Sequence, residues 1–103
     1  MIDRLVALDQ RYEEINRLLS DPEISSDYSR IENLVREQAS LKTLVSLSRK
    51  QRGLMREIED VGEMLRDESD QELAALAKEE LTRLEERRDQ VALDLKLALV
   101  PTD

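Results

Sequence analysis

The sequence contains no cysteine, histidine, tryptophan or phenylalanine, and only two residues each of glycine, proline and tyrosine. Without cysteine, disulfides and thiolate metal sites are excluded, and the redox compartment cannot be read. Without histidine or cysteine, neither a nucleophilic triad nor a zinc site of the usual kind can form. Gly53 and Gly62 stand apart, so there is no glycine-rich phosphate loop. We therefore expect a protein that is not an enzyme and that binds no cofactor and no metal.

Paired carboxylates are the remaining candidates for acid–base chemistry. They occur at Glu13-Glu14, Glu79-Glu80 and Glu85-Glu86. Carboxylates do such work when a pocket removes them from water and tunes their pKa. Here they alternate with Arg and Lys on what should be outer helix faces, so we interpret them as a solvated surface.

Long apolar runs are absent as well. The first residues, Met1 to Arg4, lack the apolar core of a signal peptide, and no stretch approaches ~18 uncharged apolar residues. The net charge is −8 and the pI about 4.6. An acidic balance argues against nucleic acid or an anionic membrane as the main partner. We expect a cytoplasmic protein with no membrane partner and no small-molecule substrate.

What the sequence does contain is charge and regularly spaced leucine. Charged residues make up 39% and hydrophobic residues 40% of the 103 positions. Disordered chains are usually poor in large aliphatic residues, so amphipathic helices are the better interpretation. A first helix is predicted from about Asp3 to Leu19, before the Pro22 that cannot continue it. Its apolar positions have the spacing of a coiled-coil seam and are Leu5, Leu8, Tyr12, Ile15 and Leu19.

The second helical stretch should begin near Ser26 or Asp27, which are both good N-cap residues. Its apolar stripe lapses around residues 49–53 and then resumes. Because Gly53 costs about 1 kcal/mol relative to alanine inside a helix, the segment 27–67 is either one bent helix or two helices. The apolar positions are Tyr28, Ile31, Leu34, Val35, Leu41, Leu44, Val45 and Leu47, then Leu54, Ile58, Val61 and Leu65.

The last helix is predicted to follow a turn at residues 67–70 and to stop at Pro101. Ser69, with Glu72 three residues later, resembles a capping box at its start. Its apolar stripe consists of Leu73, Leu76, Ala77, Leu81, Leu84, Val91, Leu95 and Leu99. Short turns favour antiparallel neighbours. The predicted fold is all-α, a single domain over residues 1–103, built as an elongated, coiled-coil-like bundle of three to four helices in antiparallel hairpins.

A local basic cluster stands out against the acidic background. Residues 38–56 contain no Asp or Glu and carry a charge of +5, against −8 for the whole chain. Such a cluster can contact RNA phosphates or an acidic protein surface. It can equally neutralise the acidic last helix packed nearby, and no aromatic residue accompanies it for base stacking. The candidate contact residues are Arg49, Lys50, Arg52 and Arg56.

Five runs are spread along the whole chain. They are Leu18-Leu19-Ser20-Asp21-Pro22-Glu23, Arg36-Glu37 with Leu41, Met64-Leu65-Arg66-Asp67, Leu73-Ala74-Ala75-Leu76-Ala77-Lys78-Glu79-Glu80-Leu81 and Leu97-Ala98-Leu99-Val100-Pro101-Thr102-Asp103. In their sequence, order and distances these runs resemble the beginning of the bacterial peptide chain release factor family, and the closing run fits factor 1 better than factor 2. In the closing run, Ala98, Val100 and Thr102 depart mildly from the family's pattern.

The resemblance implies a role in translation termination. The chain would correspond to the family's N-terminal helical domain, without the codon-reading domain and the Gly-Gly-Gln domain. In the family this domain is a non-catalytic arm of a class I factor that recognises UAA and UAG. The arm reaches toward the GTPase-associated region of the large ribosomal subunit, near the stalk-base protein and the recycling GTPase, release factor 3. No catalytic residue of the family maps onto this chain.

Two other function classes remain open on the residues alone. One is a structural coiled-coil module that oligomerises through its seams, although the lapse at residues 49–53 counts against unbroken heptads. The other is an RNA-gripping helical arm similar to that of seryl-tRNA synthetases. The net charge of −8 counts against that arm, which needs a basic stripe along its length.

Overall fold

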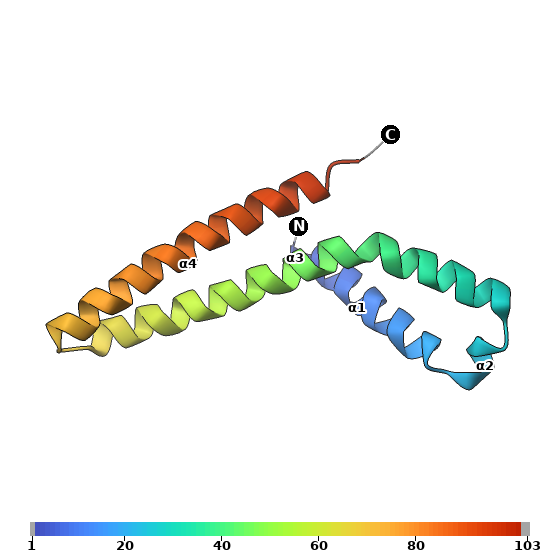
Figure 1. The fold of residues 1–103 in the computed structure, drawn as a ribbon, viewed down its shortest axis with the longest axis horizontal. Coiled ribbons are helices and arrows are strands. Elements are labelled where there is room, and N and C mark those ends of the chain that lie inside the picture. Colours follow the sequence, from blue (N-terminus) through green and yellow to red (C-terminus); the bar gives the residue numbers. More distant parts are fainter. Residues whose placement is uncertain (1, 102–103) are drawn as a thin grey trace. The chain divides into compact units, whose positions relative to one another are not determined.

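The structure, a computed structural model, describes residues 2–101 and contains only helices over that range. The helices are α1 (Ile2–Leu19), α2 (Pro22–Ser25), α3 (Tyr28–Asp67) and α4 (Gln71–Ala98) (Figure 1). The all-α prediction is therefore confirmed. Thr102 and Asp103, from the closing run, lie outside the described residues. The chain divides between Ser46 and Leu47 into two compact units, which are described in turn.

The first unit packs α1 and α2 against the beginning of α3. Its core is formed by Ile15, Ile24 and Leu34, one from each helix, and Ile15 is completely buried. Partly buried apolar side chains surround this core, namely Leu18, Leu19, Ile31 and Leu41. Burying an aliphatic side chain of this size contributes about 1.5–3 kcal/mol. The predicted stripe of the first helix thus faces the core, as its spacing requires.

The short helix α2, between α1 and α3, was not predicted from the sequence. Its N-cap is Asp21, whose Oδ1 accepts a hydrogen bond from the Glu23 N–H at 3.0 Å. Pro22 occupies the first helical position, where its missing N–H costs nothing. The turn that results places Ile24 in the core. The Asp-Pro pair that ends α1 therefore also begins α2.

Polar contacts fix the register of α1 along α3 within the first unit. Arg11 donates from Nε to Glu37 Oε2 at 2.6 Å and from Nη2 to Oε1 at 2.7 Å. Gln38 donates from Nε2 to Asn16 Oδ1 at 2.8 Å. The two-point contact orders a planar guanidinium against a planar carboxylate, so it admits one alignment of the helices. The hydrogen bonds of Arg11 lower the pKa of Glu37.

Helix α3 is one continuous helix of 40 residues that passes through Gly53 and Gly62. The predicted alternative of two helices is therefore wrong. Asp27 caps it, accepting from the Arg30 N–H at 3.1 Å, in agreement with one of the two expected N-caps. One glycine costs only about 1 kcal/mol, too little to end a helix that packing holds on both sides of it.

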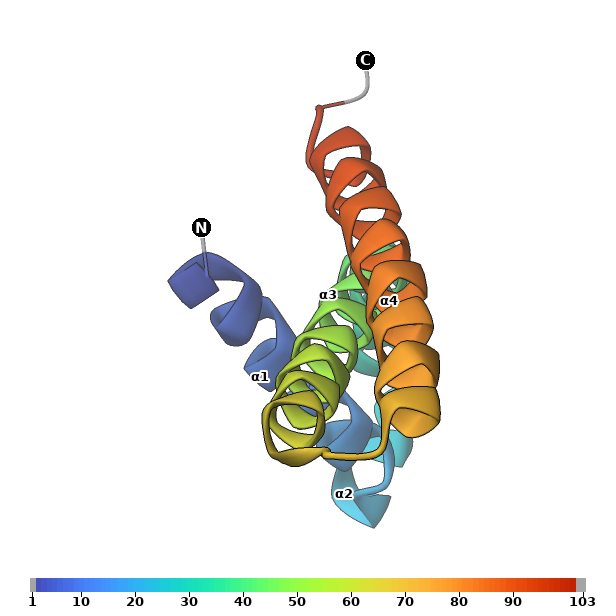
Figure 2. The ribbon, with the colours of Figure 1, turned by 90° about the vertical axis from the view of Figure 1, so that its left-hand side faces the viewer.

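The second unit is an antiparallel hairpin formed by residues 47–67 of α3 and by α4. Figure 2 looks onto the turn that joins them. Buried residues on α4 recur every seven positions at Ala77, Leu84 and Val91, the period of a coiled-coil seam. Leu54 is the matching buried residue of α3, and Leu84 is only 2% exposed.

The start of α4 differs from the prediction by one residue. The N-cap is Asp70, not Ser69, because its Oδ1 accepts from the N–H groups of Glu72 at 2.9 Å and Leu73 at 3.3 Å. Glu68 accepts from the Asp70 N–H at 3.0 Å and steadies the turn. Asp70 directly precedes the first helical residue, and its carboxylate accepts from both N–H groups. Ser69 therefore has no capping role.

Four residues assigned to apolar stripes are in fact exposed. Tyr28 is 82% exposed, Val35 47%, Leu73 51% and Leu76 60%. Tyr28 is the first residue of α3, where the helix has no preceding turn against which to pack. Leu73 and Leu76 lie beside the buried seam of α4, which runs through Ala77.

Within residues 2–101, no helix is long and apolar enough to cross a membrane.

Candidate interaction site

The four candidate contact residues named from the sequence lie on α3 in the second unit, on two faces of the helix. Arg49, Arg52 and Arg56 follow one another at spacings of three and four and share one exposed face. Arg49 and Arg52 are already engaged in an interaction within the protein. Lys50 lies on the other face, which turns toward α4. The helix therefore separates the four candidate residues, and Lys50 lines a recess between α3 and α4.

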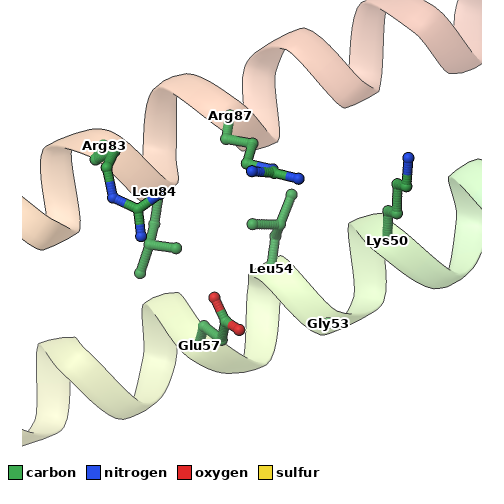
Figure 3. A pocket seen from close by; sticks show the side chains of 7 residues that line it. All are labelled: Lys50, Gly53, Leu54, Glu57, Arg83, Leu84 and Arg87. Atoms are coloured by element: carbon green, nitrogen blue, oxygen red, sulfur yellow. The ribbon is translucent and has the colours of Figure 1, made fainter.

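That recess is an open groove of about 350 Å³ between α3 and α4 (Figure 3). Leu54 and Leu84 form its apolar floor. Lys50, Gly53 and Glu57 line it from α3, and Arg83 and Arg87 line it from α4. In Figure 3 the Lys50 ammonium rises toward α4, while the Arg83 and Arg87 side chains extend toward α3. We call this the basic groove.

Arg83 is held in place by its own helix. Its Nη2 donates to Glu80 Oε1 at 2.6 Å and its Nε to Glu80 Oε2 at 3.1 Å. These hydrogen bonds raise the pKa of Arg83 and lower that of Glu80, and the charge of Glu57 raises the pKa of Arg83 further. Arg83 is thus a fixed, largely compensated cation. The groove's uncompensated charge must come from its other cations.

Lys50 and Arg87 supply that charge. Over residues 2–101 the structure gives neither of them an ion pair, and both are exposed. Against them stands the carboxylate of Glu57 on α3. Two exposed cations above an apolar floor can bind an anionic group such as phosphate or carboxylate. No aromatic residue lines the groove, so stacking on a nucleobase is not available to it.

Gly53 has no side chain and so leaves open space in the basic groove. A Cβ added at this position would meet no atom within 4 Å, and the backbone there is ordinary right-handed helix. Neither conformation nor internal packing therefore requires glycine. Gly53 lines the groove together with Lys50, so a bound group can approach the backbone of α3 closely there.

Of the cations that line this groove, the sequence analysis named Lys50 as a candidate contact but did not name Arg83 or Arg87. Their spacing of four residues, one helical turn, was a visible signal that both face the same way. What brings them opposite Lys50 is the alignment of α4 along α3, which depends on the three-residue turn between the helices.

Among residues 2–101 there is also no group of three acidic side chains arranged to hold a metal ion.

Comparison with known proteins gives a consistent match. The PCRF domain family matches residues 8–103. Over all 103 residues the chain is 40% identical to peptide chain release factor 1 of Halalkalibacterium halodurans, 38% to that of Listeria welshimeri and 33% to that of Syntrophomonas wolfei. The chain spans 29% of the length of each of these relatives. No solved structure matches it.

Proposed function

Because the chain belongs to the PCRF domain family, we propose that it acts in translation termination, as the ribosome-contacting arm of a class I peptide chain release factor. The observation that carries this proposal is the match to factor 1 over the whole chain, at up to 40% identity. Factor 1 membership favours the stop codons UAA and UAG. The arm works in the cytoplasm and has no catalytic role of its own.

The proposed partner is the large ribosomal subunit, at its GTPase-associated region and stalk-base protein, with release factor 3 nearby. The basic groove is the proposed contact. Lys50 and Arg87 bind phosphate oxygens of ribosomal RNA, with Arg83 as a fixed neighbour. Phosphate contacts position a protein without reading sequence, which suits a groove that has cations but no aromatic residue. Arg49, Arg52 and Arg56 contribute a second, adjacent basic face.

Binding of the chain to isolated large subunits, titrated with salt, tests the contact. Replacing a cation that touches phosphate removes one released counterion, so Lys50→Glu and Arg87→Glu should each lower the slope of log K against log salt by ~1. Lys42→Glu is the matched control, because Lys42 is an exposed cation of α3 outside the groove. It should lower affinity less and leave the slope unchanged.

An equal effect of all three variants would reduce the contact to general electrostatics and contradict the role of the groove. Absence of binding, or binding that an intact release factor 1 does not compete, would contradict the ribosome-contacting arm itself. The non-catalytic role is tested separately. Added to ribosomes stopped at UAA, the chain should release no peptide, whereas release above background would refute it.

A further inference from the structure

A second groove lies at the turn end of the same hairpin and differs from the basic groove in chemistry. It has a volume of about 240 Å³ and is bounded by residues 61–64 of α3, by Glu68 of the turn and by residues 73–80 of α4. Its walls are apolar, with carboxylates at the margin. The lining residues are Val61, Met64, Glu68, Leu73, Leu76, Ala77 and Glu80. We call it the apolar groove.

The large apolar side chains of this groove face water. Met64 is 52% exposed, Leu73 51% and Leu76 60%. Leu73 and Leu76 are three residues apart and form a second apolar stripe on α4 beside the buried seam residue Ala77. The hairpin therefore closes its own seam and still presents apolar side chains from both helices. Such a concentration on a small protein is typical of an interaction surface.

Charge around the apolar groove is almost entirely negative. Residues 57–80 contain ten Asp and Glu residues against Arg66 and Lys78, so this segment alone carries the −8 of the whole chain. Glu68 and Glu80 lie in the groove lining itself. Glu80 is paired with Arg83, whose Nη2 lies 2.6 Å from Glu80 Oε1, so Glu68 is the lining carboxylate left to meet a cation. The remainder of the chain sums to zero, so the acidity of this protein belongs to the turn end of the hairpin.

The exposed apolar side chains and the negative charge together indicate which kind of ligand the apolar groove can bind. Phosphate groups and acidic proteins are repelled by residues 57–80, and a second copy of the chain would bring the same negative surface against itself. A cationic partner with an apolar face is attracted by the negative charge and can also cover the exposed apolar side chains. Two antiparallel helices with an apolar recess between them accept a third helix along the recess.

We propose that the apolar groove docks a basic amphipathic helix of a partner protein, whose apolar side chains cover Met64, Leu73 and Leu76 while its Lys or Arg residues face Glu68 at the margin of the groove. The proposal goes beyond the ribosomal RNA contact and does not depend on it, because the two grooves attract ligands of opposite charge. It adds a protein-binding surface to a hairpin whose basic groove faces anions.

A synthetic amphipathic helical peptide with a leucine face and a lysine face is the probe. Its binding to the 103-residue chain is measured by fluorescence anisotropy and mapped by amide chemical shifts. The shifts should concentrate within residues 61–80. A peptide with the same leucine face and glutamate in place of lysine should not bind. A scrambled leucine–lysine peptide, with equal charge but no apolar face, should bind much more weakly.

Leu76→Gln should lower the affinity for the lysine peptide by about tenfold, since it removes an apolar side chain that the peptide covers. Leu97→Gln is the matched control, because Leu97 is 64% exposed on the same helix outside the groove. It should change affinity by less than about twofold. Both leucines are exposed, so both variants should fold.

Glu68→Gln should weaken binding and its salt dependence while leaving the circular dichroism spectrum unchanged. Equal affinities for the Leu76→Gln and Leu97→Gln variants would overturn the proposal. Equal binding of the scrambled peptide would overturn it too, because acidity alone would then explain the attraction. Binding of the glutamate peptide, or shifts concentrated outside residues 61–80, would do the same.

Discussion

Replacing Gly53 with alanine should stabilise this protein. The position lies well inside α3, its backbone is ordinary helix, and an added Cβ would meet no atom within 4 Å. Alanine therefore adds no clash. It removes the conformational freedom that glycine has in the unfolded chain, which is the reason glycine disfavours helix interiors.

The expected gain is about 1 kcal/mol in the free energy of unfolding, the difference between glycine and alanine in a helix interior. For a domain of about 100 residues this corresponds to an increase in Tm of roughly 4–8 °C. Urea unfolding followed by circular dichroism measures it, and the dependence of free energy on urea should stay unchanged because the surface buried on folding is the same.

Gly62→Ala is the matched control. Its Cβ would lie 3.8 Å from Arg66 Nη1, an ordinary contact with the end of a flexible side chain. The same gain of about 1 kcal/mol is expected there, and the double variant should show the sum. If Gly62→Ala stabilises and Gly53→Ala destabilises, the conclusion that nothing in the fold requires Gly53 is refuted.

Two further variants test the two units separately. Leu84→Ala should lower the free energy of unfolding by about 2–5 kcal/mol, because Leu84 is 2% exposed in the α3–α4 seam. The control Leu97→Ala should change it by less than about 0.5 kcal/mol. Urea unfolding measures both variants, and equal effects would contradict the burial of Leu84 in the seam. Glu37→Gln should destabilise at neutral pH but make less difference as pH falls below 4.5. Arg11 lowers the folded-state pKa of Glu37, so the stabilisation present above the unfolded value is lost on protonation. A difference that stays constant with pH would refute this.

The sequence predicted the helices well because their signals are local. The spacing of apolar residues and Pro22 gave an end of α1 at Leu19, which the structure has. Asp27 was one of two N-caps named for the long helix, and it is the one used. Local signals also explain the errors. Ser69 and Asp70 are both good N-caps, and only the geometry of the turn decides between them.

Exposure of the apolar residues was harder to predict because it depends on partners. Leu73 and Ala77 both fit a helical stripe, yet Ala77 is 3% exposed and Leu73 51%. A helix with a broad apolar face can turn any part of it toward a neighbour, and the sequence of α4 does not say where α3 lies. For the same reason the basic groove was not predicted, because Arg83 and Arg87 come to lie opposite Lys50 only through the alignment of α4 along α3.

The net charge of −8 does not describe the local charge of this protein. Taken over the whole chain, it argued against nucleic acid as the main partner, while the basic cluster left a contact with RNA phosphates open. In the structure the negative charge lies within residues 57–80, and Lys50, Arg83 and Arg87 face a groove beyond that segment or at its edge. At a Debye length of about 8 Å in physiological salt, exposed charges farther apart than this are largely screened from one another. Local charge, rather than the total, therefore governs what each groove attracts.

Glu80 and Arg83 stand at the border between these two environments. Glu80 lines the apolar groove, Arg83 lines the basic groove, and the hydrogen bonds between them tie one to the other along α4. Each side chain compensates the charge of the other. Uncompensated, that charge would repel the ligand proposed for the adjacent groove. Without Glu80, Arg83 would stand as an uncompensated cation close to the site proposed for a basic helix. Without Arg83, Glu80 would stand as an uncompensated anion near the site proposed for phosphate. The ion pair thus lets a single hairpin present surfaces of opposite charge within a few helical turns.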